Sequence, residues 1–209
     1  MVRLVFLGPP GAGKGTQAAT LARRLGIPHL STGDLLRGAV ADRTPLGREA
    51  DEHMRAGRLV PDALVLQILR ERLQRDDTRR GFLLDGFPRN VAQAQALDAM
   101  APIDRVIGFE IPEGPLLERL TQRRVCPTCG TVYNLTTRPP IRPGVCDLDG
   151  TALVQRSDDQ EKAVRTRLKV YRESTAPLVE YFRRRGVLVP VDATGSPDEV
   201  QRRVASAIT

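Results

Sequence analysis

A glycine-rich segment near the amino terminus has the residue types and spacing needed to hold phosphate. The residues from Gly8 to Thr16 read GPPGAGKGT, directly after the apolar run Leu4 to Leu7 and directly before a helical pattern. Glycines let backbone N–H groups approach phosphate oxygens, the following helix adds positive potential, and Lys14 supplies a mobile charge. This order predicts a nucleotide phosphate-binding loop, and an ordinary strand-to-helix turn is the less favoured interpretation.

A second apolar run ends in an acidic residue. Phe82, Leu83 and Leu84 precede Asp85. In phosphoryl-transfer proteins, an acid at the end of such a strand holds Mg²⁺, which keeps much of its water shell. We therefore expect Asp85 and the hydroxyl of Thr16 to hold the ion. The alternative for Asp85 is a helix cap or another satisfied polar residue.

The three cysteines of the chain predict a metal site. They form a C-x₂-C-x₁₆-C-x₂-D pattern made by Cys126, Cys129, Cys146 and Asp149. Two close pairs at this separation are typical of a zinc ribbon, and four protein ligands indicate a structural metal instead of a catalytic one. An odd number of cysteines disfavours a disulfide framework. Asp147 is the alternative fourth ligand, and three unliganded thiols are the alternative to a metal.

Composition limits the class of protein. The chain has 209 residues, 41% hydrophobic, with 32 basic and 25 acidic residues and a net charge of +7. This length suits one globular core, and we expect a cytoplasmic protein because neither a secretory signal nor a membrane-length apolar run is found. The positive charge fits either nucleic acid or an arginine-lined cleft for small polyanions. Tryptophan is absent and aromatics are 4%, which disfavours stacking on single strands.

Apolar strands alternate with helical patterns, which predicts an α/β fold with a parallel sheet and helices on both faces. Expected strands lie at 4–7, 27–30, 82–85, 105–111 and 187–191. Expected helices lie at 16–25, over the segment with Leu35, Leu36, Arg37 and Val40, and at 45–54, 63–74, 90–100 and 114–124. One or two helices are expected at 158–185, and a last helix is opened by the capping box at 196–199. Residues 125–155, rich in Pro, Gly, Thr and Cys, are interpreted as an inserted β subdomain. Ligands bind at the carboxyl ends of such strands, where Gly8, Ser31, Asp85 and Asp192 are expected.

Several motifs together resemble the adenylate kinase family of nucleoside monophosphate kinases, over essentially the whole chain. The matching segments are Gly8 to Thr16, STGD at 31–34 with Arg37, DGFPR at 85–89 with Gln93, RRV at 123–125, Tyr133, Arg156, Asp158, Asp159, Arg165 and Arg167. The resemblance implies a P-loop NTPase-type five-stranded parallel sheet. It also implies a core (1–30, 61–122 and 160–209), a helical AMP-binding insert (31–60) and a small β insert, the LID (123–159), whose Cys₃Asp set holds zinc.

The same resemblance assigns roles to individual residues. The residues implied in catalysis are Lys14, Asp85, Arg89, Arg123, Arg156 and Arg167. Those implied in ATP binding are Gly11, Ala12, Gly13, Lys14, Gly15, Thr16, Arg119, Arg123, Val132, Tyr133 and Gly195. Those implied in AMP binding are Thr32, Arg37, Arg58, Leu59, Val60, Gly86, Phe87, Pro88, Arg89, Gln93, Arg156 and Arg167.

The implied activity is reversible, Mg²⁺-dependent transfer of the terminal phosphoryl group of ATP to AMP, giving two ADP. Such chemistry needs positioning and charge neutralisation more than a strong base. A monomer that binds ATP, AMP and ADP, but neither nucleic acid nor membrane, is expected. Alternatives are a GTP:AMP kinase, a UMP/CMP kinase, against which the long LID argues, and a nucleic-acid-binding P-loop protein. His29 and His53 are not expected to be metal ligands.

Overall fold

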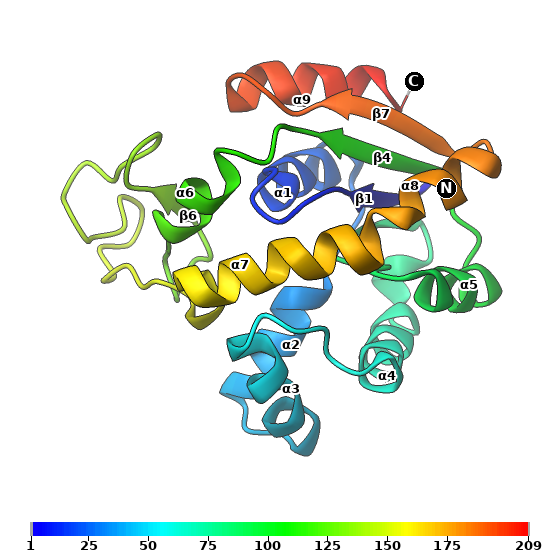
Figure 1. Ribbon diagram of the computed structural model, residues 1–209, viewed down its shortest axis with the longest axis horizontal. Coiled ribbons are helices and arrows are strands. Elements are labelled where there is room, and N and C mark those ends of the chain that lie inside the picture. The colour runs from blue at the N-terminus through cyan, green and yellow to red at the C-terminus, as the bar shows by residue number, and fades with distance from the viewer. Residues whose placement is uncertain (1, 209) are drawn as a thin grey trace.

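The computed structural model describes residues 2–208, and its centre is one five-stranded sheet with all strands parallel (Figure 1). The strand order is β2-β3-β1-β4-β7. The strands are β1 (Val2–Leu7), β2 (His29–Ser31), β3 (Gly81–Asp85), β4 (Arg105–Glu110) and β7 (Leu188–Asp192). Asp85 lies in register with both Phe6 and Ser31, so the carboxyl ends of three neighbouring strands meet at one edge. The predicted fold class is confirmed.

Helices cover both faces of the sheet because strand side chains alternate between them. Val5 and Leu7 of β1 lie in the core shared with α4 (Asp62–Leu73), α5 (Val91–Met100) and α8 (Pro177–Arg184). Leu4 and Phe6 lie in the opposite core, formed with α1 (Lys14–Leu25) and α9 (Pro197–Ser206). Near-complete burial of both faces explains why the strands read as continuous apolar runs.

Helix starts follow the capping residues of the sequence. Ser31 caps α2 (Thr32–Ala41), and Thr44 caps α3 (Pro45–Arg55) through hydrogen bonds accepted from the third helical residue. Ser196 and Glu199 form the predicted capping box of α9. Helices α2 and α3 extend away from the sheet in Figure 1, as an insert between β2 and α4 should.

The prediction that the sixth helix reaches residue 124 is wrong. Helix α6 (Leu116–Thr121) is short, and the chain then forms β5 (Arg123–Val125), which pairs antiparallel with β6 (Val132–Asn134). The Nη1 of Arg124 donates to the carbonyl of Thr121, 3.0 Å away, and so satisfies one of the carbonyls left at the helix end. Together with an isolated bridge between Val125 and Val154, these strands form the predicted β insert.

The last long helical stretch is interrupted. Helix α7 (Glu161–Val170) continues into a π turn, Tyr171–Thr175, before α8 begins at Pro177. The N–H of Ala176 donates to the carbonyl of Tyr171 at 2.8 Å, the wider i to i+5 pattern. A 3-10 turn, Asp76–Thr78, lies between α4 and β3. None of the helices within residues 2–208 is long and apolar enough to cross a membrane.

Candidate active site

The glycine-rich loop joins β1 to α1 at the carboxyl edge of the sheet. Gly11 and Gly13 have φ of 88° and 86°, a conformation that other residues rarely adopt. Gly13 is the N-cap of α1, which therefore begins at Lys14, two residues earlier than predicted. A Cβ on Gly8 would lie 2.8 Å from the Cβ of Phe109, so the loop passes too close to β4 for any side chain there. The backbone geometry is that of a phosphate cradle.

Lys14 is held inside this loop. Its Nζ donates to the carbonyls of Gly8 at 2.7 Å and Pro9 at 2.8 Å. Burial lowers the pKa of Lys14 to about 8, against the opposing attraction of Asp85 and with the help of nearby arginines. An additional anion at this position would therefore stabilise the charged ammonium.

Asp85 lies at the end of β3 beside the first turn of α1. A Cβ on Gly15 would be 3.3 Å from the Oδ2 of Asp85, so the glycine between Lys14 and Thr16 leaves room for this carboxylate. The Nε2 of His29 lies 3.6 Å from the same oxygen. Burial would raise the pKa of Asp85, but His29 and Lys14 hold it below its usual value. The carboxylate of Asp85, next to the first turn of α1 that contains Thr16, provides the oxygen ligands that Mg²⁺ prefers.

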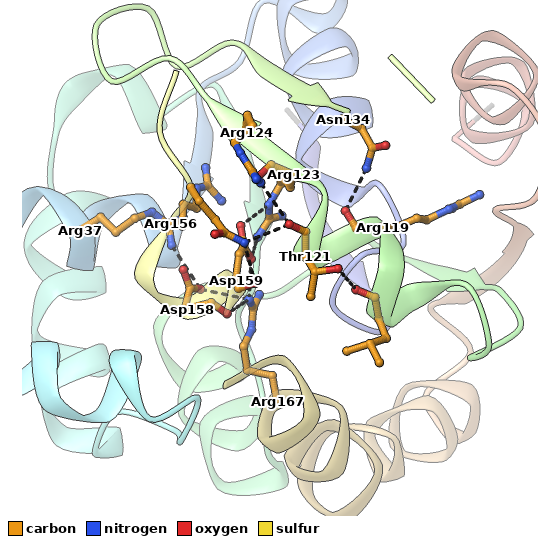
Figure 2. Close-up of polar contacts among 12 residues, drawn as sticks. Arg37, Arg119, Thr121, Arg123, Arg124, Asn134, Arg156, Asp158, Asp159 and Arg167 are labelled. Atoms are coloured by element: carbon orange, nitrogen blue, oxygen red, sulfur yellow. Dashed lines mark hydrogen bonds and ion pairs between the residues drawn. The ribbon is translucent and has the colours of Figure 1, made fainter. Parts of the chain in front are cut away.

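A cluster of arginines and carboxylates lies beyond the loop (Figure 2). Asp159 is fully buried and accepts from the Nε of Arg123 at 2.7 Å and from its Nη2 at 2.5 Å. The Nη1 of Arg167 lies 3.1 Å from Asp159 Oδ1 and donates to the backbone carbonyl of Asp158 at 2.8 Å. A strand residue and a helix residue are thereby fixed by one carboxylate, with their forks facing each other across it.

Longer ion pairs connect this cluster to the helical insert. The Nη1 of Arg37 in α2 lies 3.9 Å from Asp158 Oδ2, and the Nη2 of Arg156 lies 3.6 Å from Asp34 Oδ1. Arg37 also makes a close pair with Asp34, at 2.6 Å. Burial, with Arg37 and Arg123 nearby, lowers the pKa of Arg156 to about 10. Residues 31–60 and 123–159 are thus joined across the site by charged side chains.

Arg89 completes the set of cations. Its Nε donates to the carbonyl of Gly86 at 2.7 Å. Burial, and the like charge of Arg167, lower its pKa to about 10. The cations that influence one another here are Lys14, Arg37, Arg89, Arg123, Arg156 and Arg167, and the carboxylates among them are Asp34, Asp85, Asp158 and Asp159. Six cations face four carboxylates, so the cleft carries an excess positive charge suited to a polyanion.

The residues expected to bind AMP surround the loop after β3. Thr32 donates its hydroxyl to the carbonyl of Gly86 at 2.9 Å. Gln93, which is 1% exposed, accepts from the backbone N–H of Arg89 at 2.7 Å and donates to Asp62 at 2.6 Å. One N–H and one lone pair of its amide are thereby used, and one of each remains.

Other members of the expected AMP set differ in how much side chain they expose. Phe87 and Val60 are buried in the core, so a nucleotide would meet mainly their backbone. Pro88 is also buried, after a cis peptide bond, and Leu59 is half-buried. Arg58 is half-exposed and pairs with Glu52 at 2.9 Å, outside the arginine cluster. These contacts stay predictions.

The residues expected to bind ATP outside the loop are more dispersed. The side chain of Arg119 points away from the Arg123–Asp159 pair (Figure 2). Gly195 lies in the exposed turn before α9 with φ of 94°. Val132 is half-buried. Tyr133 is 3% exposed, and its hydroxyl accepts from the N–H of Asp147 at 2.9 Å, so any contact of Tyr133 with ATP would have to involve its backbone.

The cysteine segment forms a compact four-residue group. The ligand atoms of Cys126, Cys129, Cys146 and Asp149 all lie within 4.8 Å of one another. The two halves are alike: the N–H groups of Gly130 and Gly150 each donate to the carbonyl of the cysteine four residues earlier, at 3.0 Å. Two equivalent turns therefore present two ligands each.

The spacing within this group fits a tetrahedral zinc ion. The Sγ atoms of Cys129 and Cys146 are 3.6 Å apart, and Cys126 Sγ lies 3.2 Å from Asp149 Oδ2. Zn–S bonds of about 2.3 Å in a tetrahedron place two sulfurs about 3.8 Å apart. Asp147, the alternative ligand, accepts instead from the N–H of Ile141 at 2.8 Å. Four residues of the right chemistry can hold a metal, with Asp149 in the fourth position.

Sequence reasoning missed the residues that hold the site residues in place. No role was assigned to Asp34, Asp62, Asp158 or Asp159, although each pairs with a predicted site residue. Thr175 was also missed; it donates to the carbonyl of Arg89 at 2.7 Å from the π turn, 86 residues away in sequence. An acidic pair before an arginine-rich helix, as at Asp158-Asp159, is the one feature that could have indicated buried partners.

Comparison with known proteins points to one family in every case. The profile of the adenylate kinase family matches residues 6–187. A protein named adenylate kinase from Moorella thermoacetica is 54% identical, over 92% of this chain and 91% of its own length. Another from Thermodesulfovibrio yellowstonii is 50% identical over 99% of both chains. A third, from Archaeoglobus fulgidus, is 48% identical over 99% of this chain and 98% of its own.

Proposed function

Because the chain belongs to the adenylate kinase family and so catalyses the reversible transfer of a phosphoryl group from ATP to AMP, we propose that the cations of its cleft carry out this transfer. The observation that supports the assignment is the excess of cations over carboxylates beside a phosphate-binding loop. Transfer from the triphosphate of ATP to the phosphate of AMP requires that the two nucleotides are held in line and that their negative charge is neutralised. The reaction needs no protein nucleophile.

The donor nucleotide is assigned to the loop side. Lys14 and the N–H groups of Gly11 to Thr16 bind the β- and γ-phosphates of ATP, and Arg123 approaches from β5. Arg119 points away from the cluster, which supports its placement against the nucleoside end of ATP. Val132, Tyr133 and Gly195 complete this half-site.

The acceptor nucleotide is assigned to the opposite side. Arg37, Arg89, Arg156 and Arg167 hold the phosphate of AMP, because guanidinium forks match phosphate oxygens bidentately. Thr32, Arg58, Leu59, Val60, Gly86, Phe87, Pro88 and Gln93 form the remaining pocket. The phosphates compete with Asp34 and Asp158 for the arginines, whose contacts at 3.6 and 3.9 Å are the longest in the cluster.

Adenylate kinases use Mg²⁺ with ATP, and the ion neutralises charge on the donor phosphates when bound. Asp85 and Thr16 are the residues that would hold it. The carboxylate fits this role because it is ionised well below neutral pH and lies against the first turn of α1. Thr16 is exposed at the same turn.

Two inserts are proposed to move relative to the core. Residues 31–60 and 123–159 meet through the Arg37–Asp158 and Arg156–Asp34 pairs, which are long enough to separate at little cost. Closure over two nucleotides would exclude water from the transferring group. Zinc at the Cys₃Asp group would stiffen residues 123–159, whose apolar core is small.

Kinetics of arginine variants test the assignment. Arg89→Ala is expected to lower kcat/KM for AMP by roughly a hundredfold or more, as loss of one preorganised donor does. Arg202→Ala, which changes an exposed arginine of α9, is the control and should match the wild type. An Arg89→Ala enzyme that keeps more than about a tenth of its activity would refute the placement of Arg89 at the transferring group. The monomeric state and the lack of binding to nucleic acid or membranes remain predictions.

A further inference from the structure

We propose that Asp62 is a positioning residue that fixes the orientation of the Gln93 amide and thereby makes the acceptor site select adenine over 6-oxopurines. The inference rests on the proposed function, in which Gln93 pairs with the base of AMP. It goes further by naming a residue that does not touch the substrate and by stating what that residue decides.

Asp62 is the first residue of α4 and faces two amides of the neighbouring helix start. Its Oδ1 accepts from the Nε2 of Gln93 at 2.6 Å. The Nδ2 of Asn90 lies 3.0 Å from both Asp62 oxygens. A carboxylate can only accept hydrogen bonds, so it requires the NH₂ side of Gln93 to face it.

The opposite side of the same amide is fixed by a donor. The backbone N–H of Arg89 donates to the Oε1 of Gln93 at 2.7 Å. The backbone N–H of Gln93 donates to Asn90 Oδ1 at 2.8 Å, and this contact caps α5. Rotating the amide by 180° would place oxygen against the Asp62 carboxylate and NH₂ against the Arg89 N–H. Both contacts would then be repulsive in a site that is almost completely buried.

This fixed orientation has a consequence for base selection. Adenine presents an acceptor at N1 and a donor at its 6-amino group, whereas hypoxanthine and guanine present a donor at N1 and an acceptor at O6. At one base position, the two kinds of purine therefore need opposite orientations of a pairing amide. An amide that cannot turn pairs with one kind of purine and leaves unpaired polar groups against the other, and unpaired buried polar groups allow a site to reject a close analogue strongly.

The test is the Asp62→Asn variant, assayed with AMP and with IMP, whose base has nearly the shape of adenine. The amide introduced by this substitution can donate to a rotated Gln93, while the Arg89 N–H still opposes rotation. We expect the ratio of kcat/KM for AMP to that for IMP to fall at least tenfold without disappearing. Asp51→Asn, the same substitution on α3 at a carboxylate that pairs with Arg55, should leave the ratio unchanged.

Outcomes separate this inference from the function on which it rests. Gln93→Met should also lower the AMP-to-IMP ratio. If it does and Asp62→Asn does not, the role of Asp62 is overturned while the acceptor site stands; if Gln93→Met leaves the ratio unchanged, the assignment of Gln93 to the base fails. Asp62→Ser replaces Asp62→Asn if the latter does not fold. Side-chain amide NMR gives a direct readout, since the Gln93 NH₂ protons should exchange faster with solvent in the Asp62 variant, and unchanged exchange would contradict the proposal.

Discussion

Binding of ATP is expected to draw a proton onto Lys14. The Nζ of Lys14 lies among carbonyls and arginines, and burial lowers its pKa from 10.5 to about 8 in the free protein. At pH 8 the side chain is therefore about half protonated. Phosphate oxygens beside it favour the charged form, which raises the pKa again, so the complex should take up about half a proton at pH 8 and about a tenth at pH 7.

The measurement is titration calorimetry with ATP and excess Mg²⁺ at pH 7 and 8, in buffers that differ in ionisation enthalpy. The slope of the observed enthalpy against buffer enthalpy gives the protons taken up. The sign follows from the lowered pKa: the free protein loses the Lys14 proton as pH rises through about 8, and the complex keeps it longer. Affinity for ATP should consequently decrease as the pH rises above 8.

Lys14→Arg is the matched control, because a guanidinium stays charged over this range. Uptake at pH 8 should vanish in that variant even if it still binds ATP. Uptake below about 0.1 proton by the wild type at pH 8, or equal uptake by Lys14→Arg at that pH, would refute the conclusion that burial beside arginines keeps the pKa of Lys14 low.

Three further perturbations follow from single contacts. Asp159→Asn leaves Arg123 and Arg167, whose side chains are each 18% exposed, without their shared carboxylate and should lower the free energy of unfolding in urea by about 3 kcal/mol. Asp51→Asn, at a carboxylate that is 30% exposed and pairs with the exposed Arg55, should change it by no more than about 0.5 kcal/mol. Cys129→Ser should lower the zinc content and the melting temperature more than the activity at low temperature, and a full equivalent of zinc in the variant would remove Cys129 from the metal site. Thr175→Val removes one hydrogen bond to the Arg89 carbonyl and should raise KM for AMP about fivefold; an unchanged KM would show that the π turn does not position that loop.

Features fixed by neighbouring residues could be predicted from the sequence. The start of α9 follows from Ser196-Pro197 and Glu199, and the ends of the strands follow from short apolar runs closed by Gly8 or Asp85. The phosphate-binding loop depends on glycines at fixed offsets from a lysine, so its identity needs no tertiary information. The same holds for the cysteine turns, whose ligand spacing is local.

Features that depend on distant contacts were missed. Local periodicity predicts a helix that includes Arg123, because it carries no information on the pairing of this residue with Asn134 in a strand or with Asp159. The helix before Pro177 was predicted without a π turn, since the turn is stabilised partly by Thr175 bonding to a loop 86 residues away. The approach of Asp62 to Gln93, 31 residues apart, likewise depends on how α4 packs against α5.

The carboxylates in the cleft divide into two kinds, and the division explains how one site can be both preformed and open to ligand. Asp159 is fully buried and makes close contacts to two arginines, so it fixes their orientation before any nucleotide arrives and is too costly to displace. The Asp34 side chain is 58% exposed, and although it is paired with Arg37 at 2.6 Å, its contact with Arg156 is 3.6 Å long. A phosphate can therefore replace Asp34 beside Arg156 at little cost. Replacement of Asp34 by a phosphate beside Arg156 would leave the contacts of Asp159 unchanged. The arginines would then meet the substrate in the geometry that Asp159 imposes.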